Sequence, residues 1–458
     1  MAERSVSLED TIVALAEQKK YSTLRDILVT MNPADTAALF GELDEHLLPL
    51  LFRLLPKDAA AETFVEMEPD SQELLIRGFS DSELKEVVDE LYVDDAVDLV
   101  EEMPANVVRR ILRQADPETR KLINNILQYP DDSAGSLMTT EFVDLLPTMT
   151  VADAVKRIRR TGTDKETINI CYVIDEGRHL LGTVTIRTII LSEEDEIVSD
   201  IMNENVISVG TLTDQEDATA VFSKYDLTVV PVVDNENRLV GIITVDDALD
   251  VLETETTEDI EIMGGITPSD KPYLKTSIWE TFKARFPWLL LLMISATFTG
   301  QIISKFENAL AAAAVLTAYI PMLMDTGGNS GSQASVTVIR GISLNDIEFS
   351  DFFRVVWKEI RVAVLCGVAL AAVNFGKLLL VDGMLFHNEA ITVPVAAVVC
   401  LTMVCTILCA KLVGCTLPML AEKLGFDPAV MSSPFITTIV DALSLLIYFR
   451  FATAILQL

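Results

Sequence analysis

An aspartate lies midway along the last apolar stretch of the chain. Asp441 falls within residues 431–446, where the remaining polarity comes from serine, threonine and one proline. A carboxylate near the bilayer centre costs several kcal/mol unless it faces water or a cation. Thr437 lies one helical turn earlier on the same face, and Pro434 leaves backbone carbonyls unbonded. This stripe of hydroxyl, carbonyl and carboxylate oxygens predicts a path for a cation through the membrane.

Other roles for Asp441 stay open from the sequence. Its carboxylate can cap a partner helix, or it can pair with Lys411 or Arg450. If it binds a metal, an oxygen-only site favours a hard cation such as Mg²⁺, which gives up its waters reluctantly. The apolar stretches hold no cluster of His, Cys and Met for a softer metal.

A glycine-rich polar string interrupts the second apolar stretch. Residues 326–333 read Thr-Gly-Gly-Asn-Ser-Gly-Ser-Gln. Irregular, polar backbone at membrane depth is tolerated only against protein or a water-filled cavity. Gly327 and Gly331 form a GxxxG pair, which favours close helix packing. We expect this string to combine packing with pore lining, and packing alone is the alternative.

Charge is distributed very unevenly along the 458 residues. The first 270 residues carry 57 acidic and 22 basic side chains, whereas the remainder carries 12 and 13. So acidic a segment repels nucleic acid and anionic lipid surfaces and attracts cations. Solubility alone is the simpler explanation, but it does not account well for an excess of this size.

The sequence does not predict an enzyme. It has no P-loop and no nucleophile–base arrangement, and its three histidines (His46, His179 and His387) are unpaired. The six cysteines have no CxxC spacing and read as small hydrophobic residues.

The cytosolic part divides into two predicted modules. Residues 1–130 read as short helices with leucine-rich faces and a loose internal repeat, which predicts an α-helical superhelical domain. Residues 131–199 and 200–257 repeat one β-α-β-β-α plan, with Gly182-Thr-Val-Thr in the first copy and Gly241-Ile-Ile-Thr in the second. This duplicated pattern resembles a tandem pair of CBS domains, an α/β fold.

The carboxyl-terminal part is predicted to be an all-α membrane domain. A long acidic helix is expected over residues 248–276, ending before Pro272 or soon after it, with residues 258–277 connecting to the membrane domain at 278–458. Stretches long enough to span a bilayer occupy roughly 286–304, 309–339, 355–380, 392–420 and 428–451. Basic residues flank them on the side of the acidic domain, and the first 30 residues lack a signal peptide. We therefore expect five spans in the cell membrane and a cytoplasmic amino terminus.

These features together resemble the MgtE family of Mg²⁺ channels over nearly the whole chain. The family's marks are the string at 326–333, Asp-Pro-Ala at 427–429 and Pro-x-x-Thr-x-x-x-Asp at 434–441. The resemblance implies a lipid-embedded homodimer in which Asp441 of both protomers binds hydrated Mg²⁺. Relatives can carry Asn at the positions of Ser332 and Ser433 in this chain. The pore residues expected beside Asp441 are Gly328, Asn329, Ser332, Ser433 and Thr437.

Acidic residues also gather after the second CBS strand. Positions 247, 250, 255, 258 and 259 fall on one side of a helix, where like charges destabilise it and bridging divalent cations would reverse that effect. In the family such cations lie between the helical domain, the CBS pair and the connecting helix. Carried over by motif, the cytosolic Mg²⁺ candidates are Glu62, Asp94, Asp98, Asp214, Glu216, Asp226, Asp247, Asp250, Glu255, Glu258, Asp259 and Asp427.

The resemblance implies Mg²⁺ influx that cytosolic Mg²⁺ shuts off by screening these acids. A pathway for Co²⁺ or Ca²⁺ is an alternative, because oxygen ligands do not exclude them. A membrane-anchored CBS sensor without transport is another. CBS pairs often bind adenine nucleotides through an Asp that follows the Gly-h-h-Ser/Thr strand. Here Thr188 stands at that position in the first copy, and cation sites compete for Asp247 in the second. Both observations argue against a nucleotide at the pair.

Overall fold

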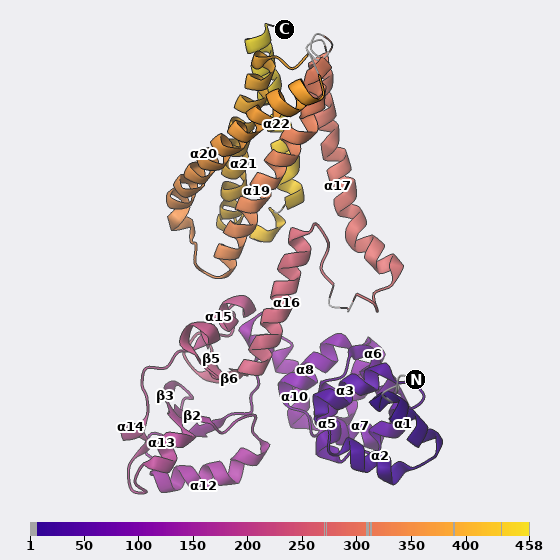
Figure 1. Cartoon of the computed structure of the whole chain (residues 1–458). Helices are drawn as coiled ribbons and strands as arrows, with labels where there is room; N and C mark the ends of the chain where they lie inside the picture. Colours follow the sequence, from indigo (N-terminus) through magenta and orange to yellow (C-terminus); the bar gives the residue numbers. More distant parts are fainter. Residues whose placement is uncertain are drawn as a thin grey trace. The chain divides into compact units, whose positions relative to one another are not determined.

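The computed structural model describes residues 7–269, 271, 273–307, 311, 314–387, 390–431 and 433–457. The chain forms two compact units, Met1–Leu252 and Glu253–Leu458, and each is described by itself (Figure 1). The second predicted apolar stretch, 309–339, begins among residues that lie partly outside the described ones.

The first unit begins with a domain of short helices around one continuous apolar core. Side-chain caps start several of them: Asn32, Asp116 and Ser80 each accept from a backbone N–H of the first turn. The predicted all-helical amino-terminal domain is confirmed. Its helices are α1 (Leu8–Glu17), α2 (Tyr21–Leu28), α3 (Pro33–Glu42), α4 (Leu48–Phe52), α5 (Lys57–Val65), α6 (Pro69–Gly78), α7 (Asp81–Val88), α8 (Val93–Glu102), α9 (Ala105–Gln114) and α10 (Pro117–Ile126).

Two three-stranded sheets follow, and they repeat one another. In each sheet the first strand pairs parallel and the third antiparallel to the middle strand, with a register shift at the equivalent place. The predicted CBS pair is confirmed. Its elements are α11 (Ala134–Leu137), β1 (Val143–Leu145), α12 (Val151–Thr161), β2 (Ile170–Ile174), β3 (Leu180–Thr185), α13 (Ile186–Leu191), α14 (Val198–Ile201), β4 (Val209–Gly210), α15 (Gln215–Tyr225), β5 (Val229–Val233) and β6 (Leu239–Thr244).

The acidic connecting helix is shorter than the sequence predicted. Helix α16 runs over Val245–Met263, so the prediction of helix to residue 276 is wrong. Gly264 and Gly265 end it, with Gly265 in the left-handed region at φ 69°, where glycine has no Cβ penalty. Pro268 follows and disfavours a restart.

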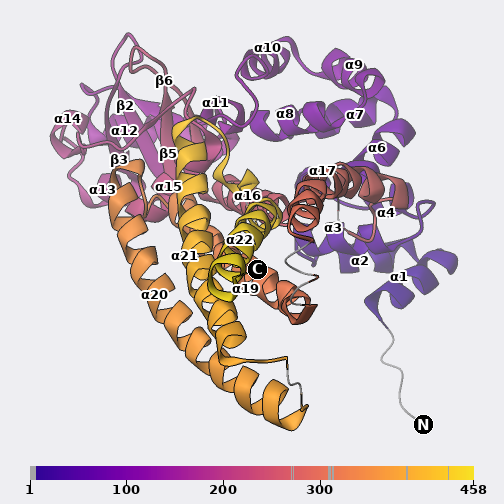
Figure 2. The ribbon, with the colours of Figure 1, turned by 90° about the horizontal axis from the view of Figure 1, so that it is seen from above.

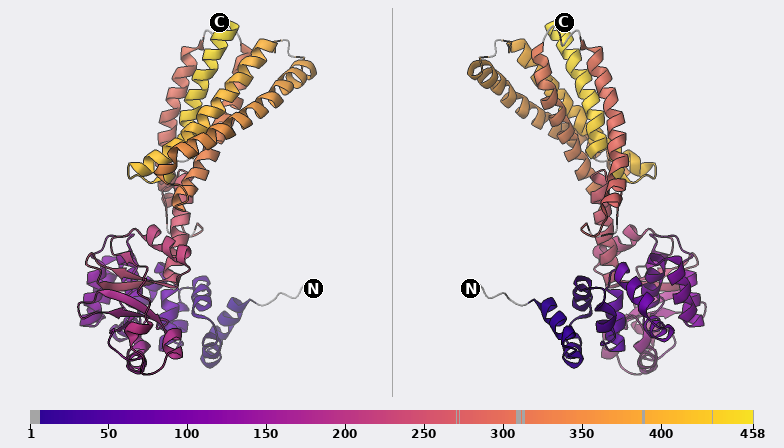
Figure 3. Two further views of the ribbon diagram at one scale, coloured as in Figure 1. Left: turned by 90° about the vertical axis from the view of Figure 1, so that its left-hand side faces the viewer. Right: turned by 90° about the vertical axis from the view of Figure 1, so that its right-hand side faces the viewer.

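The second unit is a bundle of long helices (Figures 2 and 3). Four helical segments are long and apolar enough to cross a membrane: Ile278–Lys305, Phe349–Leu385, Val393–Lys423 and Ser433–Leu456. The elements are α17 (Ile278–Lys305), η2 (Ala314–Tyr319), α19 (Ile320–Ser343), η3 (Phe349–Asp351), α20 (Phe352–Lys377), a π-helical turn η4 (Leu378–Leu385), α21 (Val393–Lys423), η5 (Pro428–Val430) and α22 (Ser433–Leu456).

Helix α19 carries the glycine string and packs mainly against α21 and α22, while α17 lies beside α22. Its 24 residues form one continuous helix, so the polar string interrupts the apolar stretch but not the helix. It is not among the four apolar segments of the described residues, because Asp325, Asn329 and Gln333 lower its hydropathy. A fifth span at α19 therefore stays a prediction.

Candidate functional site

Glycines let α19 approach its neighbours closely. A Cβ on Gly327 would lie 2.6 Å from Thr406 Cγ2 on α21 and 2.9 Å from Val440 Cγ1 on α22. A Cβ on Gly331 would lie 2.8 Å from Ile436 Cγ2 on α22. These distances are below ordinary contact, so the predicted packing role of the GxxxG pair is confirmed.

The neighbouring residues of α19 join polar groups of α22. Ser433 Oγ donates to Ser332 Oγ at 2.7 Å, and Ser332 Oγ donates to Gly328 O at 2.9 Å. A Cβ on Gly328 would lie 2.9 Å from Thr437 Cγ2. The structure thus brings together four of the six predicted pore residues: Gly328, Ser332, Ser433 and Thr437.

Asn329 lies on a more exposed face of α19. With Ser332, Gln333, Val336 and Thr337 it lines a hollow of about 610 Å³ on the surface of the single chain. Its Nδ2 donates to Asp325 Oδ1 at 3.1 Å, one turn earlier. A polar stripe therefore follows one face of α19 from Asp325 onward.

Asp441 is half-buried on α22, and Asp325 of α19 is the residue whose charge acts on it. Asp325 was missed in the sequence, although it lies one helical turn before Asn329. Among the described residues, Asp441 has no ion pair within 4 Å. Lys411, which the sequence left as an alternative partner, is 3.3 Å from Glu359 of α20, with both side chains nearly buried. That pairing alternative for Asp441 is therefore wrong.

A second group of carboxylates lies in the first unit, between α8 and the CBS pair. We call it the interdomain acidic cluster. Glu141 Oε2 accepts from the backbone N–H of Val93 and from Thr139 Oγ1, both at 3.1 Å, and Thr244 Oγ1 donates to Asp247 Oδ2. The cluster's members act on one another electrostatically: Asp94, Asp95, Asp98, Glu141, Glu166, Asp246 and Asp247.

Burial and mutual repulsion raise the pKa values of this cluster. Burial, and then repulsion from neighbours that include Asp247, raise the pKa values of Asp95 and Glu166 to about 7. The pKa of Asp94, 8% exposed, is raised well above its ordinary value for the same reasons. Burial also raises the pKa of Glu141 and of Asp247. The pKa of Asp98 is raised in the same way. Its side chain is exposed to solvent, which screens the repulsion, so Asp98 contributes less to the strain in the cluster than the buried members do.

Two oxygens of the cluster lack partners. Asp94 Oδ1 and Glu166 Oε2 are buried without a hydrogen bond, although buried polar atoms are nearly always paired. Among the described residues, no three His, Cys, Asp or Glu side chains are arranged to hold an ion directly.

Two further predicted carboxylates, Asp259 and Asp427, act on one another in the second unit. Asp259 near the end of α16 accepts from Ser343 Oγ at 3.1 Å. Burial raises its pKa, and the charge of Asp427 raises it further. Asp427 in turn accepts from the backbone N–H of Ala429 and starts η5.

The other predicted cation residues are dispersed. Asp214 caps α15 by accepting from Glu216 N at 2.9 Å, and Asp226 ends that helix in the left-handed conformation. Asp250 adds to the repulsion on Asp247. Glu62 is exposed on α5, and Glu255 and Glu258 lie on α16.

Sequence reasoning found Asp94, Asp98 and Asp247 but missed the other members of the interdomain acidic cluster. Asp95 neighbours a named residue, so helix geometry offered a signal. Glu141 and Glu166 come from loops of the first CBS copy, and only the fold brings them to α8.

Comparison with protein families matches the chain in three parts. The intracellular N domain of MgtE matches residues 15–132, the CBS domain matches 134–194 and 198–254, and the MgtE divalent cation transporter matches 320–451.

Relatives match nearly end to end. Magnesium transporter MgtE of Thermus thermophilus is 36% identical over 457 residues, covering 99% of this chain and 98% of the relative. The Bacillus subtilis protein of that name is 32% identical over 450 residues, 97% of each. A crystal structure of the cytosolic domain of the Mg²⁺ channel MgtE in complex with ATP is 37% identical, with a TM-score of 0.51, and covers 53% of this chain and 100% of that one. The chain belongs to the MgtE family of magnesium transporters.

Proposed function

We propose that this chain forms a Mg²⁺ influx channel or transporter in the cell membrane, working as a homodimer with its amino terminus in the cytoplasm. The observation that carries the proposal is Asp441, a half-buried carboxylate in an apolar helix, without an ion pair among the described residues, beside the polar stripe of α19. An intramembrane carboxylate of this kind marks an ion pathway.

The chemistry of the pathway fits a hydrated hard cation. Asp441, Asp325 and Asn329 offer carboxylate and amide oxygens, and Ser332 offers a hydroxyl. Mg²⁺ prefers oxygen ligands and retains several waters. A divalent ion moving through 100 mV gains about 4.6 kcal/mol, at roughly 2.3 kcal/mol per charge. Influx into a negative cytoplasm needs no other energy source.

Reconstituted flux tests the proposal. Liposomes holding a Mg²⁺-sensitive dye should show uptake with the parent chain and at least a tenfold slower uptake with Asp441→Asn. Thr453→Ala is the matched control, because among the described residues that hydroxyl donates to backbone oxygens of its own helix, Phe449 O and Arg450 O. Parent-like flux from well-incorporated Asp441→Asn would refute the pore assignment. Uptake of Co²⁺ or Ca²⁺ in preference to Mg²⁺ would favour another divalent cation, and no flux from the parent chain would favour a sensor without transport.

We further propose that the interdomain acidic cluster senses cytosolic Mg²⁺. Its support is a group of crowded carboxylates with two unpaired buried oxygens. Cations would neutralise the repulsion and hold α8 against the CBS pair, while Asp259 and Asp427 would act in the same way near the end of α16. Several ions are needed, because one weak site cannot supply the few kcal/mol of differential binding that gating requires.

The double variant Asp95→Asn/Glu166→Gln tests this sensor. This variant removes two negative charges and keeps the size of both side chains. Helix α8 should therefore stay packed against the CBS pair without Mg²⁺, and flux should no longer depend on internal Mg²⁺. Asp89→Asn is the control, since Asp89 is an exposed acid that pairs with Lys85. Unchanged inhibition by internal Mg²⁺ in the double variant would rule out this role.

Whether the first unit binds a nucleotide is a separate question from Mg²⁺ transport. A relative's cytosolic domain binds ATP, which makes the first unit of this chain a candidate. Thr188 and the engagement of Asp247 in the acidic cluster argue against the usual ribose contact at the CBS pair. A nucleotide would have to use other side chains.

A further inference from the structure

A buried ion pair joins two helices of the second unit. Lys411 Nζ of α21 lies 3.3 Å from Glu359 Oε2 of α20, and the two side chains are 7% and 12% exposed. Both helices belong to the segments that are long and apolar enough to cross a membrane. Lys411 lies roughly three helical turns before the end of α21 at Lys423, so it is not one of the lysines near a helix end that extend to the membrane surface.

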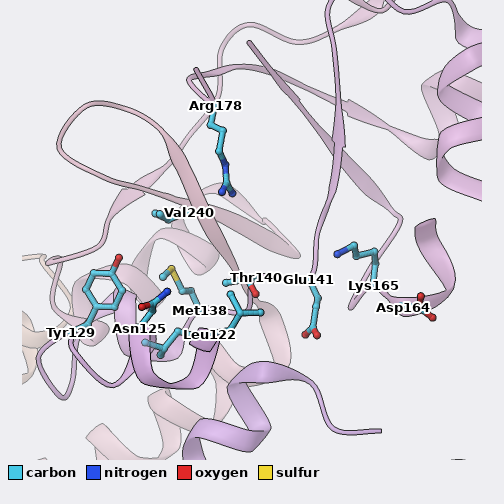
Figure 4. Close-up of a pocket in the computed structure, with 11 residues that line it drawn as sticks. Leu122, Asn125, Tyr129, Met138, Thr140, Glu141, Asp164, Lys165, Arg178 and Val240 are labelled. Carbon is cyan, nitrogen blue, oxygen red and sulfur yellow. The ribbon is translucent and has the colours of Figure 1, made fainter. Parts of the chain in front are cut away.

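Burial and direct contact distinguish this pair from other charges in the chain. In the first unit, the charge of Lys165 acts on Glu141 in a pocket of about 440 Å³ (Figure 4). Both of those side chains are partly exposed, so water screens their attraction. Among the described residues, the other ion pairs of the apolar segments each lie within a single segment. The pair between α20 and α21 is therefore a contact that holds two segments together.

Small residues bring α20 close to α21 beside the ion pair. Ala363 and Gly367 follow Glu359 at four-residue spacing and so lie on the same face of α20. Together with Asn374 they are the buried residues of this helix. A Cβ on Gly367 would lie 3.3 Å from Val404 Cα of α21. Helix α20 thus meets α21 along one narrow stripe, with the ion pair at its cytosolic end.

The residues near Lys411 on α21 also contact the glycine string of α19. A Cβ on Gly331 would lie 3.2 Å from Ala410 O, and a Cβ on Gly414 would overlap the backbone oxygen of Gly331. Backbone meets backbone here, and closely packed interiors transmit displacements. The position of α21 along its axis therefore influences where the glycine string lies, including Ser332, which follows Gly331 directly.

Stability alone does not explain a buried ion pair. Taking two charges out of water costs so much that replacing such a pair with apolar residues of similar size is often neutral or stabilising. What the pair supplies is geometry, because its charges meet at one register of the two helices. A shift of one turn would leave both charges unpaired in an apolar environment, at high cost.

We propose that Glu359 and Lys411 form a positioning pair for Mg²⁺ transport. The pair fixes the register of α20 against α21, and so holds the backbone at Ala410 and Gly414 against Gly331 of the glycine string. Both side chains act through this helix contact rather than on the ion. The inference rests on the proposed function, because the position of the glycine string affects transport only if the string lines the ion path.

The double variant Glu359→Met/Lys411→Met tests the positioning role, because it removes both charges and keeps long, unbranched side chains. Its melting temperature in detergent should stay level or rise, whereas Mg²⁺ flux into liposomes should fall at least fivefold. The exchanged pair Glu359→Lys/Lys411→Glu restores opposite charges and should recover flux to within twofold of the parent. A pair that only stabilised the fold would change melting temperature and flux together.

A native thiol reports the helix register independently of flux. Cys415, one turn after Lys411, is buried in an apolar cluster that residues of α19, α20 and α21 form together. Its labelling by N-ethylmaleimide in liposomes can be followed by mass spectrometry of peptides. Labelling should be slow in the parent and in the exchanged pair, and at least fivefold faster in Glu359→Met/Lys411→Met.

Asp351→Met/Arg354→Met is the matched control. It removes a more exposed ion pair within the same apolar segment, and it should match the parent in flux and in labelling. The proposal is overturned if Glu359→Met/Lys411→Met keeps both parental flux and parental labelling, or if the exchanged pair transports as slowly as the methionine variant. A parent chain that passes no Mg²⁺ refutes the proposed function instead, and the labelling of Cys415 still decides whether the pair fixes the register.

Discussion

At the scale of single residues, oxygen-bearing side chains were largely readable from the sequence. Asp441 could be identified because a charge in an apolar stretch is costly. The family motifs near it identified Ser332 and Ser433, which hydrogen-bond to each other in the structure. Asp325 was missed because only the packing of α19 against α22 places its charge near Asp441. Local pattern identifies a costly residue, but not the partner that folding brings to it.

Asp325 gives a prediction at this scale. Its carboxylate adds negative potential beside Asp441 and so concentrates cations. Asp325→Asn should slow Mg²⁺ flux several-fold and make it less sensitive to ionic strength, without abolishing it. Asp346→Asn, an exposed acid in the loop after α19, is the control in the same liposome assay. Equal flux from Asp325→Asn and the parent would exclude Asp325 from the pathway.

At the scale of elements, the type of each module was predictable and the ends of helices were not. The CBS pair could be predicted because the same order of strands and helices occurs twice in the sequence. The acidic helix was predicted to be too long, because the two glycines that end it, Gly264 and Gly265, were not taken as its end. The glycine string interrupts the apolar stretch in the sequence but not the helix α19, and its glycines lie closely packed against α21 and α22, as their GxxxG spacing predicted.

Two glycine substitutions test that packing. A Cβ on Gly414 of α21 would lie 2.2 Å from the backbone oxygen of Gly331, and backbone cannot move aside cheaply. Gly414→Ala should therefore lower the melting temperature in detergent by several degrees. Gly376→Ala on α20, with nothing within 4 Å, should leave it level or raise it, because alanine is the better helix former by about 1 kcal/mol. Equal melting temperatures would contradict the close helix contact.

At the scale of the whole molecule, the acidic excess has a thermodynamic consequence. Because the pKa values of Asp95 and Glu166 are raised to about 7 when folded, the folded chain holds protons that the unfolded chain releases above roughly pH 4. Without Mg²⁺, stability of the first unit should fall as pH rises from about 4 to about 7. Excess Mg²⁺ should remove most of that slope, as measured by hydrogen exchange in α8.

The same linkage predicts competition between protons and Mg²⁺. Apparent Mg²⁺ affinity of the full chain should weaken as pH falls below about 7, and Asp95→Asn/Glu166→Gln should flatten that dependence. A parental affinity that is level between pH 8 and pH 6 would mean that the interdomain acidic cluster does not bind the ion. The sequence predicted an acidic sensor, but not that Glu141 and Glu166 belong to it.

Patch-clamp recording from membranes that contain the parent chain, with Mg²⁺ outside and the internal Mg²⁺ concentration stepped upward, measures both Mg²⁺ conduction and its inhibition from the inside. We expect an inward Mg²⁺ current that declines as internal Mg²⁺ rises. A membrane that contains the folded chain and passes no Mg²⁺ current at low internal Mg²⁺, or a current that ignores internal Mg²⁺, would contradict it.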